Sequence, residues 1–267
     1  MSAPLPRLDP YLATLGEDVE DLSRIGVAQP FRSSGPTLSR ADLDVLTRAA
    51  DARLRRVAPT PALVEAGLMK DGGGLTDDGR FVTTVLTSPQ GRLRVESGRG
   101  RAPLTLDVSV RGGVALALAT ASPASLPTAP RGEQILDAAA AVTLDVVDLA
   151  GVPALVASWV GLAPAWSLAT SPEELPEQTV LARVDDPETS PPPGADAHLR
   201  HVWSQPWFLW TLGTSGGPTG LTMINAGPSG HLALTSTGTE GHVGLRAVPS
   251  AVVWSALVRT TGQLATG

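Results

Sequence analysis

The sequence predicts an α+β fold in which two antiparallel β-meanders, each followed by a helix, are related by a pseudo-two-fold axis. One strand-turn-strand pattern occurs twice, as LTLDVSVRGGVALAL at 104–118 and as LTMINAGPSGHLAL at 221–234. Each copy is followed by a strand that runs into an apolar helix, the first from Thr143 and the second from Gly244. A meander with one helix cannot bury its apolar face alone, so two copies predict two packed halves.

Composition excludes several classes of protein. The chain has 267 residues, of which 42% are apolar, so it can bury a substantial core. A net charge of −6 without a dense basic cluster argues against nucleic-acid binding. The absence of cysteine removes disulfides and thiolate chemistry. No basic apolar leader and no apolar window near 18 residues occurs, so we expect a cytoplasmic protein without membrane insertion.

The N-terminal third begins with an arm and continues with helices. Residues 1–36 are rich in proline and show little periodicity beyond a short helix from Tyr11 to Ile25, which predicts a loosely attached arm. Ser39 and Asp42 have the spacing of a capping box, and the apolar residues after them recur at helical spacing. A further helix is expected between Thr76, which can cap it, and Pro89, which stops it.

The rest of the chain divides at a proline-rich stretch. Residues 91–97, GRLRVES, alternate apolar and charged side chains as a half-buried strand does. Residues 163–197 contain many prolines and are predicted to connect a first half, 37–162, to a second half, 198–262. Residues 37–267 are thus expected to form a single domain. The second half opens with a helix near 195–204 and the strand WFLWTL.

This order of elements resembles the EspG family of type VII (ESX) secretion chaperones. The resemblance rests on the capped helix LSRADLDVL, on a helix that ends in proline before a Leu-x-Val strand, and on the repeated meander. The closing segment GHVGLRAVPSAVVWSALV is the most similar part, and the resemblance covers about residues 37–262. The proline-rich arm before Ser39 departs from the family pattern, and its role stays open.

The resemblance implies a cytosolic, non-catalytic chaperone that keeps a helical secretion substrate soluble. In the family the clients are PE and PPE heterodimers, and the chaperone grips the apolar tip of the PPE helical bundle. The connection after the second strand contributes to client binding there. The matching loop in this sequence, Ser97 to Pro103, carries Arg99 and Arg101. We expect it to contact the client, and the alternative is a solvated hairpin tip. No cofactor is implied.

A serine hydrolase using Ser215 is an alternative of a different class. Gly213-Thr-Ser215-Gly-Gly217 has the spacing of a nucleophile elbow, which needs a strand before the serine and a helix directly after it. WFLWTL supplies the strand, but the residues that follow predict a hairpin. His231 and His242 are the available bases, and only Glu240 could orient one of them. We therefore expect no histidine within hydrogen-bond reach of Ser215. A non-catalytic structural or regulatory interaction protein is the third hypothesis.

The remaining polar and aromatic clusters have simpler explanations. His198 and His201 are three residues apart on an expected helix, but no third ligand is near in sequence, so no metal site is predicted. Trp203, Trp207 and Trp210 belong to the densest aromatic cluster of the chain. Apolar residues on both faces of a strand usually mean burial on both faces. The alternative is that one of these tryptophans reaches the partner-binding surface, where tryptophan is a common hot spot.

Overall fold

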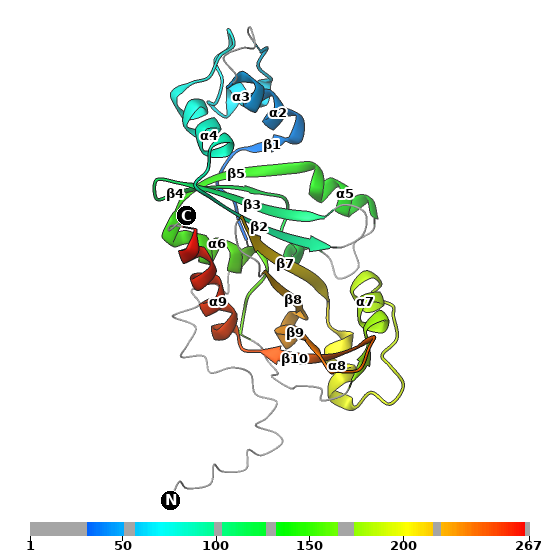
Figure 1. Ribbon diagram of the computed structural model, residues 1–267. Helices are drawn as coiled ribbons and strands as arrows, with labels where there is room; N and C mark the ends of the chain where they lie inside the picture. Colours follow the sequence, from blue (N-terminus) through cyan, green and yellow to red (C-terminus); the bar gives the residue numbers. More distant parts are fainter. Residues whose placement is uncertain are drawn as a thin grey trace, which may run out of the picture.

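The fold is built around one ten-stranded antiparallel sheet (Figure 1). It is seen in a computed structural model that describes residues 31–50, 57–98, 103–126, 132–164, 174–215 and 220–264. The order of strands across the sheet is β1-β5-β4-β3-β2-β7-β8-β9-β10-β6. The strands are β1 Thr37–Ser39, β2 Gly91–Gly98, β3 Leu104–Arg111, β4 Val114–Ala119, β5 Ala141–Asp148, β6 Leu175–Pro176, β7 Phe208–Thr214, β8 Leu221–Asn225, β9 His231–Ser236 and β10 His242–Val248.

The predicted repeat is confirmed by this topology. Strands β2 to β5 follow one another across one half of the sheet and lead into helix α6, Val152–Trp159. Strands β7 to β10 do the same in the other half and lead into α9, Ser250–Gln263. The halves join where β2 pairs with β7, antiparallel, with Val95 opposite Leu212. A pseudo-two-fold axis between β2 and β7 produces this order of strands. The predicted α+β fold class is confirmed.

Helices α6 and α9 cover one face of the sheet, which we call the α6/α9 face. Their buried residues, among them Trp159 and Leu257, form one core cluster with the inward side chains of the central strands, such as Val95 and Trp210. The two helices also contact each other. Helix α5, Gly132–Ala140, adds Ala139 to the same cluster. Burial of this many large apolar side chains is the main source of stability for the fold.

The opposite face is covered by two separate helical layers. Over the first half lie α2 Arg40–Ala49, α3 Pro61–Glu65 and α4 Asp77–Thr87, which form a core cluster with Leu116 and Leu144. Over the second half lie α7 Glu177–Asp185 and α8 Ala197–Ser204, which form another cluster with Ile224 and Leu232. Side chains alternate between the faces of a strand, so these clusters lie opposite the α6/α9 face. Figure 1 shows the two layers at separate ends of the sheet.

The proline-rich segment between the halves contains structure that the sequence did not predict. Residues 165–173 lie outside the described part, and helix α7 begins after them, at Glu177. It follows the two-residue strand β6, which pairs with the start of β10. The prediction of residues 1–36 as an arm also falls mostly outside the described residues, although β1 pairs with β5 directly after them. The division into domains stays a prediction.

The predicted capping box at the start of α2 is confirmed and extended. Ser39 accepts a hydrogen bond from the backbone N–H of Asp42, and the Asp42 carboxylate accepts one from the backbone N–H of Ser39 at 2.8 Å. Thr60, the N-cap of α3, donates its hydroxyl to the other carboxylate oxygen at 2.6 Å. Hydrogen bonds from Ser39 and Thr60 hold the pKa of Asp42 below its ordinary value. One carboxylate therefore ties two helix starts together.

We expect Asp42→Ala to lower the free energy of unfolding by about 1–2 kcal/mol, the usual effect of losing a cap. Because the folded pKa of Asp42 is depressed, its contribution is present above the ordinary value of 3.8 and is lost as the pH falls through the folded pKa. Urea unfolding at neutral pH measures the difference. Asp44→Ala, an exposed position on the same helix, is the matched control. Equal losses in the two variants would contradict the prediction.

Within the described residues, no helix is long and apolar enough to cross a membrane.

Candidate protein-binding surface on the central strands

The middle of the sheet has one buried face and one open face. On the α6/α9 face, Leu93 and Val95 of β2 are buried, with exposed fractions of 1% and 0%. On the opposite face, the alternate residues of β2 and β7 are exposed or half-buried, and Asp107 of β3 is half-buried between the buried Thr105 and Ser109. We call these residues the central strip: Arg92, Arg94, Glu96, Asp107, Thr211, Gly213 and Thr222. The pairs Arg94–Asp107, Arg94–Gly213 and Thr211–Thr222 are opposite one another across the strands.

The central strip is open because the two helical layers do not meet over it. The core cluster of α2 to α4 reaches the sheet at β4 and β5, through residues such as Leu116 and Leu144. The cluster of α7 and α8 reaches it at β8 to β10, and only the half-buried Leu209 extends it onto β7. The strands between them, β2 and part of β7, therefore carry polar side chains on this face. The arrangement leaves a strip of sheet between the two helical layers.

Charges of both signs are paired along the strip. Arg94 donates to Glu96 at 3.0 Å and to Asp107 at 3.2 Å, and all three side chains are between 40% and 54% exposed. Burial raises the pKa of Asp107, while the nearby Arg94 and Arg40 act in the opposite direction. Exposed ion pairs of this kind contribute little to stability. Their effect here is to hold the Arg94 guanidinium between the two carboxylates.

The predicted loop residues Arg99 and Arg101 lie outside the described residues. Strand β2 ends at Gly98 and β3 begins at Leu104, so the loop joins the two strands that carry Arg94 and Asp107. It continues from one end of the central strip. The role of both arginines in partner binding stays a prediction.

The three tryptophans singled out from the sequence are buried. Trp203, Trp207 and Trp210 have exposed fractions of 2%, 1% and 0%. The indole N–H of Trp203 donates to the carbonyl of Thr189, and that of Trp207 donates to the carbonyl of Val202, each at 2.8 Å. This placement agrees with the interpretation of the cluster as core. Contact of any of the three with a partner stays a prediction.

Strand β7 is buried on the α6/α9 side, but the prediction of burial on both sides is wrong, because on the other side Leu209 is half-buried and Thr211 and Gly213 are exposed. Trp210 belongs to the core cluster of the α6/α9 face, whereas Leu209 packs against the cluster of α7 and α8. Trp203 and Trp207 pack against each other, with ring centroids 5.0 Å apart.

In the described part of the chain, Ser215 is hydrogen-bonded to the backbone of Arg92 and to no histidine. Its hydroxyl accepts a hydrogen bond from the backbone N–H of Arg92 at 2.9 Å. The residue is in the turn after β7, and the next described element is the strand β8, where a nucleophile elbow needs a helix. Among the described residues, no hydrogen bond joins Ser215 to His231 or His242; His242 instead lies 3.1 Å from the carbonyl oxygen of Glu240. In the described chain, Ser215 is thus not hydrogen-bonded to either histidine.

The histidine pair does not form part of a metal site in the described chain. His198 is half-buried and His201 is exposed on α8. Among the described residues, no group of three or more histidine, cysteine, aspartate or glutamate side chains could hold a metal ion.

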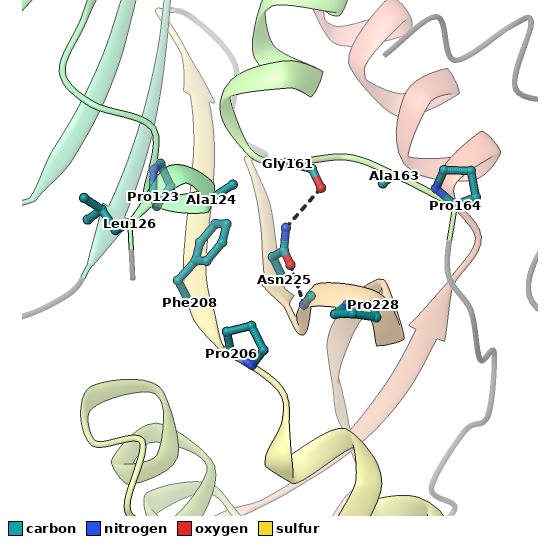
Figure 2. Close-up of a pocket in the computed structure, with 11 residues that line it drawn as sticks. Pro123, Ala124, Leu126, Gly161, Ala163, Pro164, Pro206, Phe208, Asn225 and Pro228 are labelled. Carbon is teal, nitrogen blue, oxygen red and sulfur yellow. Dashed lines mark hydrogen bonds between the residues drawn. The ribbon is translucent and has the colours of Figure 1, made fainter. Parts of the chain in front are cut away.

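A pocket of about 440 Å³ lies where the two halves meet on the α6/α9 face (Figure 2). Its lining is mostly apolar and includes Pro123, Ala124, Leu126, Pro206, Phe208 and Pro228. Asn225 of β8 donates its amide to the carbonyls of Val160 and Gly161 at 2.7 and 3.2 Å, and its side-chain oxygen accepts from the N–H of Gly227 at 2.7 Å. Asn225 therefore ties the second half to the end of α6 in the first.

None of the described lining residues has an ionisable side chain. Gly161 is required at this seam, because its φ is 65° and an added Cβ would lie 2.6 Å from the Cβ of Ala124. Sequence reasoning missed Asn225, because one asparagine at the end of a strand carries no local signal of a contact 64 residues away.

No protein-family model and no curated protein sequence matches the chain. Among solved structures, the chain is similar to the Mycobacterium tuberculosis type VII secretion system chaperone EspG5, determined in complex with a PE25–PPE41 dimer. The similarity covers 85% of this chain and 95% of that chain, with a TM-score of 0.45 and 15% identity. EspG5 is a member of the EspG family, which the sequence resembles. A TM-score of 0.45 marks a distant similarity.

Proposed function

We propose that the chain is a chaperone or adaptor that binds helical secretion substrates, such as PE/PPE-like heterodimers, and keeps them soluble for type VII secretion. The client would contact the central strip and the Gly98–Pro103 loop that continues from it. The single observation that carries this proposal is the open face of β2 and β7 between two helical layers. The resemblance of the sequence to the EspG family supports the nature of the client.

The chemistry of the central strip is suited to a helical partner. Gly213, Thr211 and Thr222 provide a surface of small side chains, so a partner helix can approach the sheet closely. Arg94 and the other charged residues stand beside it and can fix the orientation of the partner. A helical hairpin with an exposed apolar tip tends to aggregate, and covering that tip is the physical task of such a chaperone.

The most direct test is a bulky substitution on the strip. Gly213→Tyr is expected to lower capture of a co-expressed PE/PPE-like heterodimer by about ten-fold or more, because a hot-spot contact is worth about 2 kcal/mol. The side chain has room, since nothing lies within 4 Å of a Cβ added at Gly213. Gly72→Tyr, where the space is also open, is the control. The measurement is a pull-down together with the thermal midpoint.

If Gly213→Tyr does not diminish capture, the central strip is not part of the interface with the client. A well-folded wild-type chain that captures no helical heterodimer in this co-expression assay would favour the third hypothesis, a structural or regulatory interaction protein.

The loop is tested by charge reversal. Replacing both Arg99 and Arg101 by glutamate is expected to weaken capture several-fold while the thermal midpoint stays nearly unchanged, because surface substitutions usually cost within about 0.5 kcal/mol. Lys70→Glu with Arg48→Glu, both exposed and away from the strip, makes the same change in net charge. Equal effects of the two double variants would show a general effect of charge and not a loop contact.

A further inference from the structure

Residues 31–36, which we call the strap, lie along the outer edge of β5, beside β1 at one end of the sheet (Figure 1). The backbone N–H groups of Ser34 and Gly35 both donate to one oxygen of the Asp145 carboxylate on β5, at 3.1 and 3.0 Å. The carbonyl of Pro36 accepts from the backbone N–H of Leu144 at 3.0 Å. The strap therefore continues along β5 from the point where the ladder with β1 ends.

The strap passes from one face of the sheet to the other around this edge. At its start, Phe31 packs against the core cluster of the α6/α9 face. Directly after it, Leu38 of β1 is buried in the cluster of α2 to α4 on the opposite face. Between these two apolar anchors, Asp145 is 9% exposed and lies opposite Ala117 of the α6/α9 core cluster. One carboxylate thus locks the segment that joins the two anchors.

The strap approaches β5 too closely for a side chain to fit between them. A Cβ added at Gly35 would lie 1.8 Å from the carbonyl oxygen of Leu144 and 3.2 Å from Oδ1 of Asp145. The first distance is shorter than any real Cβ contact, so the backbone would have to move away from β5. Glycine is required here because its backbone can approach another chain segment directly.

Beyond the strap, the outer edge of β5 remains a surface on which a further strand can pair. Leu144 directs its N–H outward to Pro36, so Val146, two residues along, directs its N–H and C=O to the same side. In the part of the chain that the structure describes, no backbone hydrogen bond joins Val146 to a partner on that side. Its side chain is 53% exposed. An open edge with an apolar side chain is a template for pairing between chains, and natural proteins cover such edges with loops.

We propose that the strap, locked by Asp145, keeps β5 from pairing edge to edge with β5 of a second copy of this chain. Two identical antiparallel strands pair about a two-fold axis, so one surface serves both copies. With the strap closed, only residues 146–148 are open, fewer than the about five or six residues of an ordinary strand. With the strap released, residues 144–148 form an edge of ordinary length. The proposal is independent of the proposed client, which contacts the central strip on β2 and β7.

Two substitutions release the strap by different routes. Asp145→Val removes the acceptor of both N–H groups, and Gly35→Ala forces the strap backbone away from β5. If the strap is closed in about nine of ten molecules, each copy is competent to pair about a tenth of the time, so release should tighten self-association at least about ten-fold. Sedimentation velocity over a range of concentrations measures self-association of the full chain. Hydrogen exchange of the Ser34 and Gly35 amides reports separately that the strap has been released.

Three control variants separate release of the strap from changes in charge or bulk. Asp145→Asn keeps a side-chain oxygen that can accept both hydrogen bonds, so it should associate as weakly as the wild type. Asp148→Val removes an exposed carboxylate from the same strand, and Gly72→Ala adds a methyl group where space is open. Both should also behave as the wild type. Equal self-association of Asp148→Val and Asp145→Val would overturn the proposal, because loss of charge would then be the cause.

A disulfide locates the interface, since the chain contains no cysteine. Val146 is the middle residue of the 144–148 edge, so Val146→Cys combined with Asp145→Val should form an intermolecular disulfide. Val252→Cys, which replaces a valine of similar exposure on α9, should not. Equal cross-linking at both positions, or variants that stay monomeric although the strap amides exchange rapidly, would overturn the proposal. If Asp145→Val unfolds the chain, the same disulfide test is made with Gly35→Ala.

Discussion

Replacing Arg183 by methionine is expected to lower the free energy of unfolding by about 3 kcal/mol. Arg183 is a buried cation on α7, with 3% of its surface exposed. Its guanidinium donates to the carbonyl of Trp203 at 2.9 Å and to that of Gln205 at 2.6 Å, and it stacks 5.5 Å from the ring centroid of Trp207. One side chain thus ties α7 to the end of α8 and the start of β7.

The size of the effect follows from the contacts that methionine cannot make. Hydrogen bonds from a charged donor contribute about 1.5–3 kcal/mol each, and a desolvated cation–π contact adds about 1–2 kcal/mol. Two backbone carbonyls would lose their partner. Methionine recovers part of the loss because it packs well in the same volume and because burial of the guanidinium is itself costly. That cost is seen in the lowered pKa of Arg183, which burial causes and which Asp186 and Glu188 oppose.

Urea unfolding of the two variants measures this prediction, and Arg183→Lys is the informative comparison. Lysine keeps the charge but not the planar fork, so it can reach one carbonyl and should show an intermediate loss. A loss below about 1 kcal/mol for Arg183→Met would mean that the desolvation cost of the guanidinium cancels its hydrogen bonds. The native structure of the first half should be unaffected, because the described contacts of Arg183 are with residues of the second half.

The repeated meander could be predicted because each strand carries its burial pattern in its own sequence. GRLRVES alternates buried and exposed residues, and β2 has that alternation. WFLWTL is apolar at consecutive positions, which predicts burial on both sides, but β7 is buried only on the side of Trp210, and Leu209 on the other side is half-buried. By contrast, β6 has two residues, too few for any periodicity, and α7 follows it directly in a proline-rich stretch. Such elements form through tertiary contacts. Here β6 pairs with β10, and Arg183 of α7 is hydrogen-bonded to the end of α8.

The exposure of the candidate surface could be predicted from the sequence, but its opening between two helical layers could not. The charged residues of β2 indicate a solvent-facing side, but solvent exposure does not distinguish an ordinary outer face from a partner surface. What makes the central strip distinctive is that the helical layers over the first and second halves leave it open. That depends on where α4 and α7 lie across the sheet, which no local pattern specifies. In the same way, Asn225 and Arg183 act through contacts distant in sequence.

Acid is expected to destabilise the fold through His231, by roughly 3 kcal/mol between neutral pH and pH 4. His231 on β9 is 2% exposed, and its ring packs edge-on to Trp210 at 5.8 Å. Within the described residues, neither of its ring nitrogens has a hydrogen-bond partner. Burial lowers the pKa of His231 from its ordinary value of 6.5 to about 4. The neutral ring is the form that the fold accepts.

The direction of the effect follows from proton linkage. Between pH 6.5 and about 4 the unfolded chain binds a proton at His231 that the folded chain does not, so the free energy of unfolding falls as the pH falls through this window. Above pH 6.5 the contribution of the neutral ring is fully present. The difference between the two pKa values corresponds to roughly 3 kcal/mol. Urea unfolding at a series of pH values measures the slope. Burial raises the pKa of Asp107, so this residue changes the free energy of unfolding in the opposite direction as the pH falls. Its contribution is the same in all the variants and cancels in the comparison.

His231→Leu should remove most of this slope, because leucine does not titrate and suits an apolar site beside Trp210. His201→Leu is the matched control, since His201 is exposed on α8, and it should leave the slope as in the wild type. The stability of the leucine variant at neutral pH is a separate quantity and need not change much. If the slope between pH 6.5 and 4 persists in His231→Leu, the acid sensitivity belongs to the carboxylates, and the buried imidazole makes no net contribution to it.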